Sequence, residues 1–235
     1  MDLNEDGQGD ILSGSYSRRG HEDGMAGVFQ VLYGSADGKF AAAAELNGVD
    51  GKPLVIPADN DTEIPKKICT RPTAVDWDGD GDLDLVVGNF EGTFCVFSGE
   101  GKGKFDPVPK FLDANDGEAL KVPGAHSDPA LVDWDGDGDL DILSGSSEGG
   151  VHWAENLGEG SVAAFKTIIE AGSGDAWGEA VKLSALKGAA SSTRVFAADV
   201  DGDGKLDLLV GDQVTVETAA GGSETTGFVW FYRQK

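Results

Sequence analysis

The nine residues DWDGDGDLD at Asp76–Asp84 decide the fold, and the same nine letters return at Asp133–Asp141. Each copy places five carboxylates in one short stretch, where like charges repel one another strongly. A hard divalent cation removes this repulsion, because the carboxylates then become its ligands. The stretch therefore predicts a tight loop folded around a metal ion.

Two degenerate copies extend the pattern D-x-[DN]-x-D-G-x-x-D to four occurrences, with DLNEDGQGD at Asp2–Asp10 and DVDGDGKLD at Asp199–Asp207. Similar apolar stretches follow the four copies, reading ILSGS, LVVGN, ILSGS and LLVGD, and an apolar strand precedes the last three. Four short antiparallel strands in a repeat of roughly 60 residues are typical of a propeller blade. The sequence therefore predicts an all-β protein, a β-propeller of four-stranded antiparallel blades.

The four repeats divide a single predicted propeller domain, residues 1–235, into four parts. Their approximate bounds are 1–70, 71–127, 128–193 and 194–235. The first repeat lacks the strand before its loop, and the last lacks its outer strand. We therefore expect part of a larger propeller, or a ring completed by another chain or by self-association, because an unpaired strand position is an adhesive edge.

Calcium is the ion that these loops fit best, because it accepts six to eight oxygen ligands in flexible geometry. Positions 1, 3 and 5 would supply side chains, position 7 a backbone carbonyl and position 9 a further carboxylate, while position 6 is always a glycine, which a sharp turn favours. We expect up to four ions, one in each repeat. The predicted ligands are Asp2, Asn4, Asp6, Gln8 and Asp10; Asp76, Asp78, Asp80, Asp82 and Asp84; Asp133, Asp135, Asp137, Asp139 and Asp141; and Asp199, Asp201, Asp203, Lys205 and Asp207.

An EF-hand, a magnesium site and a metal-free acidic turn are the alternatives to a calcium loop of this kind. An EF-hand needs a glutamate at position 12 and flanking helices, whereas this chain has Ser13, Val87, Ser144 and Val210 there. Magnesium retains its waters and rarely occupies an all-protein cage. A solvated acidic turn without metal is the third alternative, and four copies at matching places disfavour it. The neutral Asn4 predicts weaker binding in the first loop.

Charge and composition exclude several classes of partner. Eighteen basic and 42 acidic residues give a net charge of −24, which disfavours nucleic acid and anionic membranes. No apolar run is long enough to cross a membrane, and Met1 is not followed by a signal peptide. We therefore expect either a mature form or a true start further upstream. Cys69 and Cys95 allow either one disulfide or two buried thiols.

The stretches DWDGDGDLDLVVGN and DVDGDGKLDLLVGD, with the turns that follow them, resemble FG-GAP or VCBS repeats. These repeats form the blades of the integrin α-subunit head and of many secreted bacterial propellers. The resemblance implies calcium loops between the first two strands of each blade, and ligand binding on the opposite face. It also implies a role in cell adhesion or carbohydrate binding. Because millimolar calcium outside the cytoplasm suits loops of this kind, we expect an extracellular or periplasmic location.

Two functions from different classes follow. The first is a non-catalytic, calcium-stabilised binding or adhesion module for carbohydrate or protein ligands. The alternative is the propeller domain of a secreted polysaccharide lyase or another carbohydrate-active enzyme. We favour the binding module and predict no catalytic residue, because an enzyme needs a base or nucleophile in a convergent pocket, and His21, His126 and His152 show no recognisable catalytic spacing.

Candidate ligand contacts are few. Arg18, Arg19 and His21 form a basic group in a long turn, which would suit a sulfated or carboxylated sugar or would simply be a solvated loop tip. We expect Trp77 and Trp134 to pack between blades, and Trp153 and Trp230 to lie in the core. An exposed tryptophan on the rim would instead stack on a sugar ring.

Overall fold

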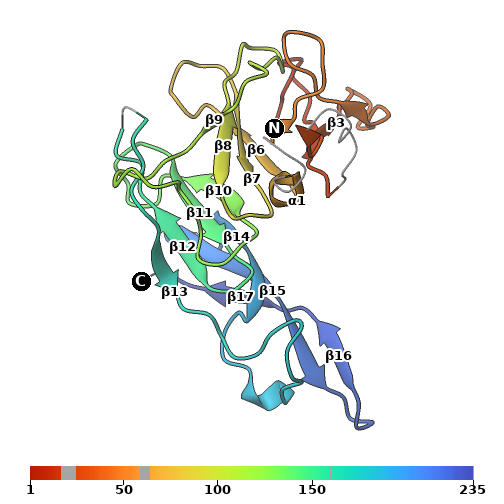
Figure 1. Cartoon of the computed structure of the whole chain (residues 1–235), viewed down its shortest axis with the longest axis vertical. Helices are drawn as coiled ribbons and strands as arrows, with labels where there is room; N and C mark the ends of the chain where they lie inside the picture. The colour runs from red at the N-terminus through yellow and green to blue at the C-terminus, as the bar shows by residue number, and fades with distance from the viewer. Residues whose placement is uncertain (17–24, 59–63, 159, 235) are drawn as a thin grey trace.

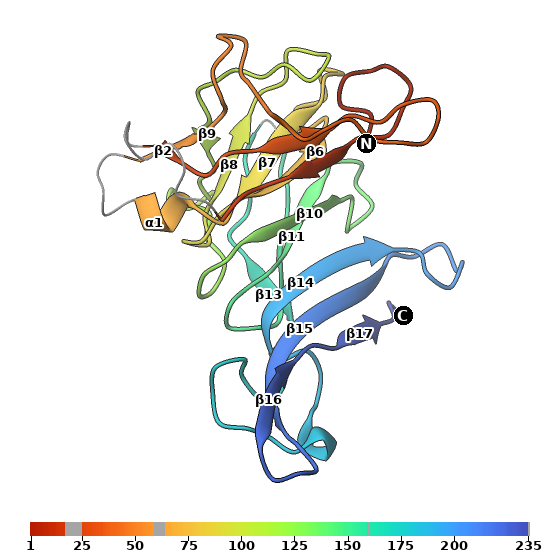
Figure 2. The same ribbon diagram turned by 90° about the vertical axis from the view of Figure 1, so that its right-hand side faces the viewer.

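A computed structural model of the chain describes residues 1–16, 25–58, 64–158 and 160–234. The molecule is all-β, and four antiparallel sheets are arranged as the four blades of a β-propeller. The blades follow one another in chain order, so that the first blade lies at one end of the molecule and the fourth at the other (Figures 1 and 2). The fold class agrees with the prediction.

The strands of the second, third and fourth blades are consecutive in the sequence, whereas a short strand of another sheet interrupts those of the first blade. The first blade contains β1 (Ile11–Ser13), β3 (Gln30–Leu32) and β4 (Ala44–Glu45); the second β6 (Arg71–Val75), β7 (Asp84–Gly88), β8 (Phe94–Phe97) and β9 (Lys110–Phe111); the third β10 (Asp128–Val132), β11 (Asp141–Gly145), β12 (Val151–Ala154) and β13 (Lys166–Ile169); the fourth β14 (Ser191–Ala198), β15 (Asp207–Glu217), β16 (Ser223–Thr226) and β17 (Val229–Tyr232).

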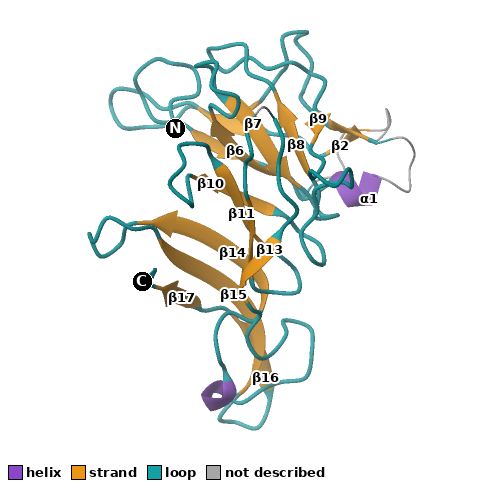
Figure 3. Ribbon diagram, turned by 90° about the vertical axis from the view of Figure 1, so that its left-hand side faces the viewer, coloured by secondary structure: helices purple, strands orange, loops and turns teal. Residues whose placement is uncertain are grey.

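The remaining elements are short. A two-stranded sheet pairs β2 (Met25–Ala26) with β5 (Ile56–Pro57). Helix is confined, among the described residues, to α1 (Ile64–Lys67) and the 3-10 turn η2 (Leu183–Ala185), drawn in purple in Figure 3. No described helix has both the length and the apolar character needed to cross a membrane.

Alternating side chains join each blade to both of its neighbours. On β7, Leu85 and Val87 pack in an apolar cluster with the first blade, whereas Val86 packs in a second cluster with the third blade. On β11 the same alternation places Ile142 in the second cluster and Leu143 in a third, shared with the fourth blade. Successive side chains of a strand point to opposite faces, so one strand contributes to two inter-blade cores.

The tryptophans occupy these cores as the sequence predicts. Trp77 packs against the cluster between the second and third blades. Trp134, Trp153 and Trp230 pack against the cluster between the third and fourth blades. Trp177 differs, because it is 86% exposed.

A hydroxyl residue fastens each of the last three blades to the blade before it. Its oxygen accepts a hydrogen bond from a backbone amide of the preceding blade at 2.8–3.0 Å, and its own amide donates to the carbonyl of the same partner. These pairs are Thr70 with Ser15, Ser127 with Asn89, and Thr193 with Ser146. Two hydrogen bonds at one point fix the spacing of neighbouring blades.

Glycine is required beside each of these contacts. A Cβ at Gly14, Gly88 or Gly145 would lie less than 3.0 Å from the backbone carbonyl of the hydroxyl residue in the next blade. Gly211 ends the same run in the fourth blade (LLVG), and a Cβ there would meet nothing within 4 Å. The glycine is therefore needed wherever a following blade packs against the strand.

Two further features of the fold need the structure. The stretch QVTVETAAGGSETTG of the last repeat, whose small and polar residues are typical of a turn, instead extends β15 to Glu217 and pairs it with β16, because Val214 and Val216 alternate with polar residues and lie in a small apolar cluster. Cys69 and Cys95 are both buried free thiols, and burial raises the pKa of Cys95 to about 12. The structure thus decides between the two alternatives for the cysteines.

Candidate metal sites and the inner-strand pocket

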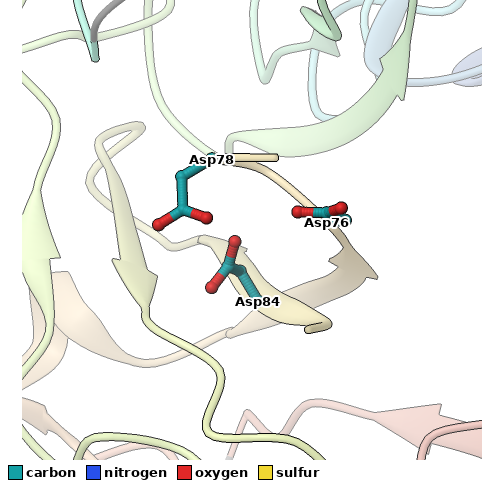
Figure 4. Close-up of side chains that lie close together, drawn as sticks. All are labelled: Asp76, Asp78 and Asp84. Atoms are coloured by element: carbon teal, nitrogen blue, oxygen red, sulfur yellow. The ribbon is translucent and has the colours of Figure 1, made fainter. Parts of the chain in front are cut away.

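The acidic loops lie between the first two strands of the second, third and fourth blades. The loop after β6, for example, begins at Asp76 and ends where β7 starts at Asp84. Figure 4 shows the carboxylates of Asp76, Asp78 and Asp84 turned toward one another. Their ligand atoms lie within 4.8 Å of one another. An ion with metal–oxygen distances of about 2.4 Å fits between oxygens at that separation.

The third and fourth loops bring positions 1, 3 and 5 together, whereas the second brings positions 1, 3 and 9 together. Their clusters, also within 4.8 Å, are Asp133, Asp135 and Asp137, and Asp199, Asp201 and Asp203. In the third loop, desolvation and the surrounding carboxylates, Asp141 and Asp137 first, raise the pKa of Asp135. Crowded carboxylates with oxygen atoms only are a donor set for a hard cation. These three acidic clusters could each hold a metal ion.

Hydrogen bonds within the loop hold its carboxylates in place. Both oxygens of Asp76 accept backbone amides, from Gly79 at 2.8 Å and from Gly81 at 3.1 Å. Asp78 accepts the amide of Asp80 at 3.2 Å. The turn requires a φ of 98° at Gly81, a backbone conformation that glycine adopts without steric cost. The loop is therefore shaped by its own side chains.

The aspartate at position 9 is a structural residue as well as a predicted ligand. Asp84 is buried and accepts the amides of Trp77 at 2.9 Å and Gly99 at 2.7 Å. Desolvation, followed by the charge of Asp78, raises the pKa of Asp84. Asp10, Asp141 and Asp207 are buried and make the corresponding pair of hydrogen bonds. Position 9 thus ties the loop to the second residue after β3, β8, β12 or β17.

The other predicted ligands are placed less uniformly. Asp80 does not belong to the cluster of the second loop, although its equivalents do in the next two loops. At position 7, Gln8, Asp82, Asp139 and Lys205 donate their amides to the carboxylate at position 5. Their proposed role as carbonyl ligands stays a prediction.

The first loop departs from the other three. Asn4 donates its amide Nδ2 to Asp6 at 3.0 Å. The loop therefore has one carboxylate fewer at position 3, and the repulsion between its carboxylates is weaker. Glu5 occupies position 4, where the other three loops have glycine. It has a φ of 60°. This site, formed by Asp2, Asn4 and Asp6, has fewer carboxylates than the others, in line with weaker binding.

The fourth loop carries a competing cation. Arg233 contacts two of its carboxylates, with Nε 2.5 Å from Asp201 Oδ2 and Nη2 3.5 Å from Asp203 Oδ2. Lys205 adds a second positive charge at position 7. A bound divalent ion would be repelled by both side chains. We therefore expect the second and third loops to bind calcium more tightly than the fourth.

Arg233→Gln should raise the calcium affinity of the fourth loop by about three- to tenfold, because it removes a positive charge within a few ångströms of the ion. An NMR titration that follows the amide of Gly204 in the fourth loop measures this affinity. The amide of Gly138 in the third loop is the internal control. An unchanged or lower affinity at Gly204 would show that Arg233 does not oppose the ion.

Three cavities lie on the described part of the molecule, and the widest, about 560 Å³, is an open hollow beside Leu183 and Glu217. The larger of the other two, about 480 Å³, lies beside the acidic loops between the second and third blades, and Trp77, Lys110 and Asn156 contribute to its wall. The smaller, about 360 Å³, is here called the inner-strand pocket, and it is lined by Tyr16, Cys69, Arg71, His126, Trp177 and Arg194, among others. Arg71 begins β6 and Val75 ends it at the loop, so this pocket lies at the end of the blades opposite the loops.

Sequence reasoning missed the charged residues of this pocket. Arg71, Asp128 and Arg194 occupy one equivalent position, since each pairs with the last glycine of the blade's second strand. Counting back five residues from the first aspartate of each loop finds all three, so an alignment of the repeats carries the signal. The predicted basic group of Arg18, Arg19 and His21 lies outside the described residues.

The other two histidines have different environments. His152 is buried, and its ring nitrogens lie 3.1 Å from Thr167 Oγ1 and 3.2 Å from the carbonyl of Gly149. It is a hydrogen-bonded core residue, as expected. His126 lines the inner-strand pocket and contacts Phe90, with ring centroids 4.4 Å apart. Desolvation and the neighbouring Arg71 and Arg194 lower the pKa of His126.

Repeated antiparallel blades, three of them four-stranded with an acidic loop after the inner strand, define a repeat protein of the β-propeller class. A sequence model described as the FG-GAP-like repeat matches the chain at residues 76–143 and 133–210, which together span more than half of it. The chain belongs to the FG-GAP-like repeat family.

Solved structures also resemble this chain. No curated protein sequence matches the chain significantly. A lectin of Agrocybe aegerita, described for specific recognition of non-reducing terminal N-acetylglucosamine, is similar in structure, with a TM-score of 0.43 and 18% sequence identity. The similarity covers 94% of this chain and 52% of the lectin chain. The chain thus spans about half the length of that lectin.

Proposed function

We propose that this protein is a non-catalytic binding module for carbohydrate or protein ligands, and that calcium ions in its acidic loops stabilise the blades. The observation that carries the proposal is the set of three carboxylate clusters, each within 4.8 Å, at one equivalent place in three blades. Structural calcium in such loops would connect the first two strands of each blade. Extracellular or periplasmic calcium, at millimolar levels, suits loops of this kind.

The face opposite the loops is the proposed ligand face. It carries the inner-strand pocket, and the exposed rings of Trp177 and Tyr16 stand at its edge. Exposed aromatic rings in a polar cavity favour a sugar, because a ring face stacks on the apolar face of a pyranose. Carbohydrate is therefore the ligand class that we prefer.

The proposed lack of catalysis rests on how the titratable groups are used. His152 makes two structural hydrogen bonds, and the crowded aspartates form the candidate metal clusters. A general acid or base has to reach a substrate in a convergent pocket. We therefore propose no general acid or base among the described residues.

The test is retention on immobilised neutral and acidic polysaccharides, in calcium and in excess chelator, with a parallel assay for unsaturated sugar products. We expect calcium-dependent retention and no product. Asp133→Asn with Asp135→Asn should weaken retention at low calcium, whereas Asp37→Asn, at an exposed turn, is the matched control. Calcium-dependent release of unsaturated sugars would overturn the proposal in favour of a lyase, and a lack of retention on every member of the panel would contradict carbohydrate binding.

A further inference from the structure

The inner-strand pocket contains two arginines held by one aspartate from the blade between them. Arg194 Nε lies 3.0 Å from Asp128 Oδ2, and Arg71 Nη1 lies 4.0 Å from Asp128 Oδ1. The three side chains come from the inner strands β6, β10 and β14, which lie next to one another. They are between 21% and 36% exposed. Two guanidinium groups in the pocket therefore share a single protein carboxylate.

Arg71 retains hydrogen-bonding capacity. Its Nε is buried and has no hydrogen-bond partner in the described structure, and its Nη2 donates to Cys69 Sγ at 3.1 Å. Sulfur is a weak acceptor, so the guanidinium lacks the strong acceptors that its planar fork normally binds in pairs. A second carboxylate in the pocket would supply a strong acceptor to the exposed part of this guanidinium.

The formal charges of the pocket balance, because Asp128 and Asp212 match Arg71 and Arg194, but the arginines face only the first of these carboxylates. Asp212 also lines the pocket, but its oxygens accept three donors, the amides of Ala190 and Phe228 and the indole Nε1 of Trp230. These donors stabilise the Asp212 carboxylate without using either arginine.

Equivalent residues of three repeats line the pocket. Cys69, His126 and Ser192 line it, and each lies two residues before the charged position of its blade. All three have a positive φ, of 59°, 63° and 52°, which is uncommon for residues other than glycine. The same backbone conformation in three blades fixes the positions of the charged residues that follow.

The rim adds aromatic surface for a sugar ring. Trp177 is 86% exposed and Tyr16 is 64% exposed, and both line the pocket. Tyr16 is oriented by an edge contact with Phe90, at a centroid distance of 6.3 Å. A volume of about 360 Å³ lies in the range of small-ligand sites and accommodates a monosaccharide unit.

We propose that the inner-strand pocket binds the carboxylate of an acidic sugar, with Arg71 and Arg194 on the carboxylate and Trp177 on the sugar ring. This inference rests on the proposed binding function and names its ligand class. A uronic acid combines the planar anion with the ring that the pocket requires. Neither a neutral sugar nor an isolated inorganic anion uses both parts of the site.

The test is calorimetric titration of the calcium-loaded protein with sodium glucuronate, glucose and inorganic phosphate at constant ionic strength. We expect glucuronate to bind at least tenfold more tightly than either of the other two. Arg71→Gln should lower the glucuronate affinity at least tenfold, and Trp177→Ala several-fold. Lys187→Gln removes one positive charge from an exposed site outside the pocket and should leave the affinity unchanged.

Two further variants guard against a folding defect. Arg194→Lys retains the charge but loses the fork, and Trp177→Ala alters an exposed side chain, so both should keep the melting temperature of the native protein. Unchanged glucuronate affinity in Arg71→Gln and Arg194→Lys would overturn the inference, as would equal binding of phosphate. Retention of the native protein on a neutral polysaccharide with no glucuronate binding would overturn the inference and leave the proposed binding function standing.

Discussion

Removal of calcium with excess EGTA is expected to lower the melting temperature of this protein by at least about 10 °C. Each ion binds the folded loop far better than the unfolded chain, and contributes about 2.7 kcal/mol when its free concentration is 100 times the dissociation constant. Without it, clusters such as Asp133, Asp135 and Asp137 remain as mutually repelling carboxylates. Scanning calorimetry in calcium and in chelator measures the difference.

The control is EGTA that has been saturated with calcium, which tests for effects of the chelator itself. Magnesium at the same concentration should restore little of the lost stability, because it prefers to keep its waters. Coincident melting curves in calcium and in excess EGTA would mean that the acidic loops fold and persist without an ion.

Gly145→Ala is expected to destabilise the folded state by about 3 kcal/mol. The new Cβ would lie less than 3.0 Å from the backbone carbonyl of Thr193 in the next blade, and a backbone group cannot move aside cheaply. The two blades would have to separate, which strains the hydrogen bonds between Thr193 and Ser146. Urea unfolding of the calcium-loaded protein measures the loss.

Gly211→Ala is the matched control, because it makes the same change at the same position of the last blade. A Cβ there meets nothing within 4 Å, and neither glycine has a positive φ. We expect a change within about 0.5 kcal/mol. Equal losses in the two variants would show that intrinsic strand propensity, and not contact between blades, determines the need for glycine at this position.

Local patterns account for the parts of the fold that were predicted from the sequence. The acidic loop is stabilised by hydrogen bonds among its own residues, such as those from Gly79 and Gly81 to Asp76, so nine letters suffice to recognise it. The alternation of Leu85, Val86 and Val87 between two cores likewise follows from the period of a strand.

Contacts between blades account for what was missed. The pocket brings together Arg71, Asp128 and Arg194, which lie more than 50 residues apart in sequence and meet only because the inner strands are neighbours. The extension of β15 pairs residues across a hairpin in a stretch rich in small and polar residues, where turn signals resemble those of a plain loop. Aligning the four repeats reveals the first of these features but not the second.

The central claim is that the repeated aspartates hold calcium, and crystals grown in calcium test it most directly through anomalous difference density. The account predicts strong peaks in the second and third loops, within bonding distance of Asp76 and Asp78 and of Asp133 and Asp135, and weaker peaks in the first and fourth. Loops that show no anomalous peak in excess calcium would contradict the account.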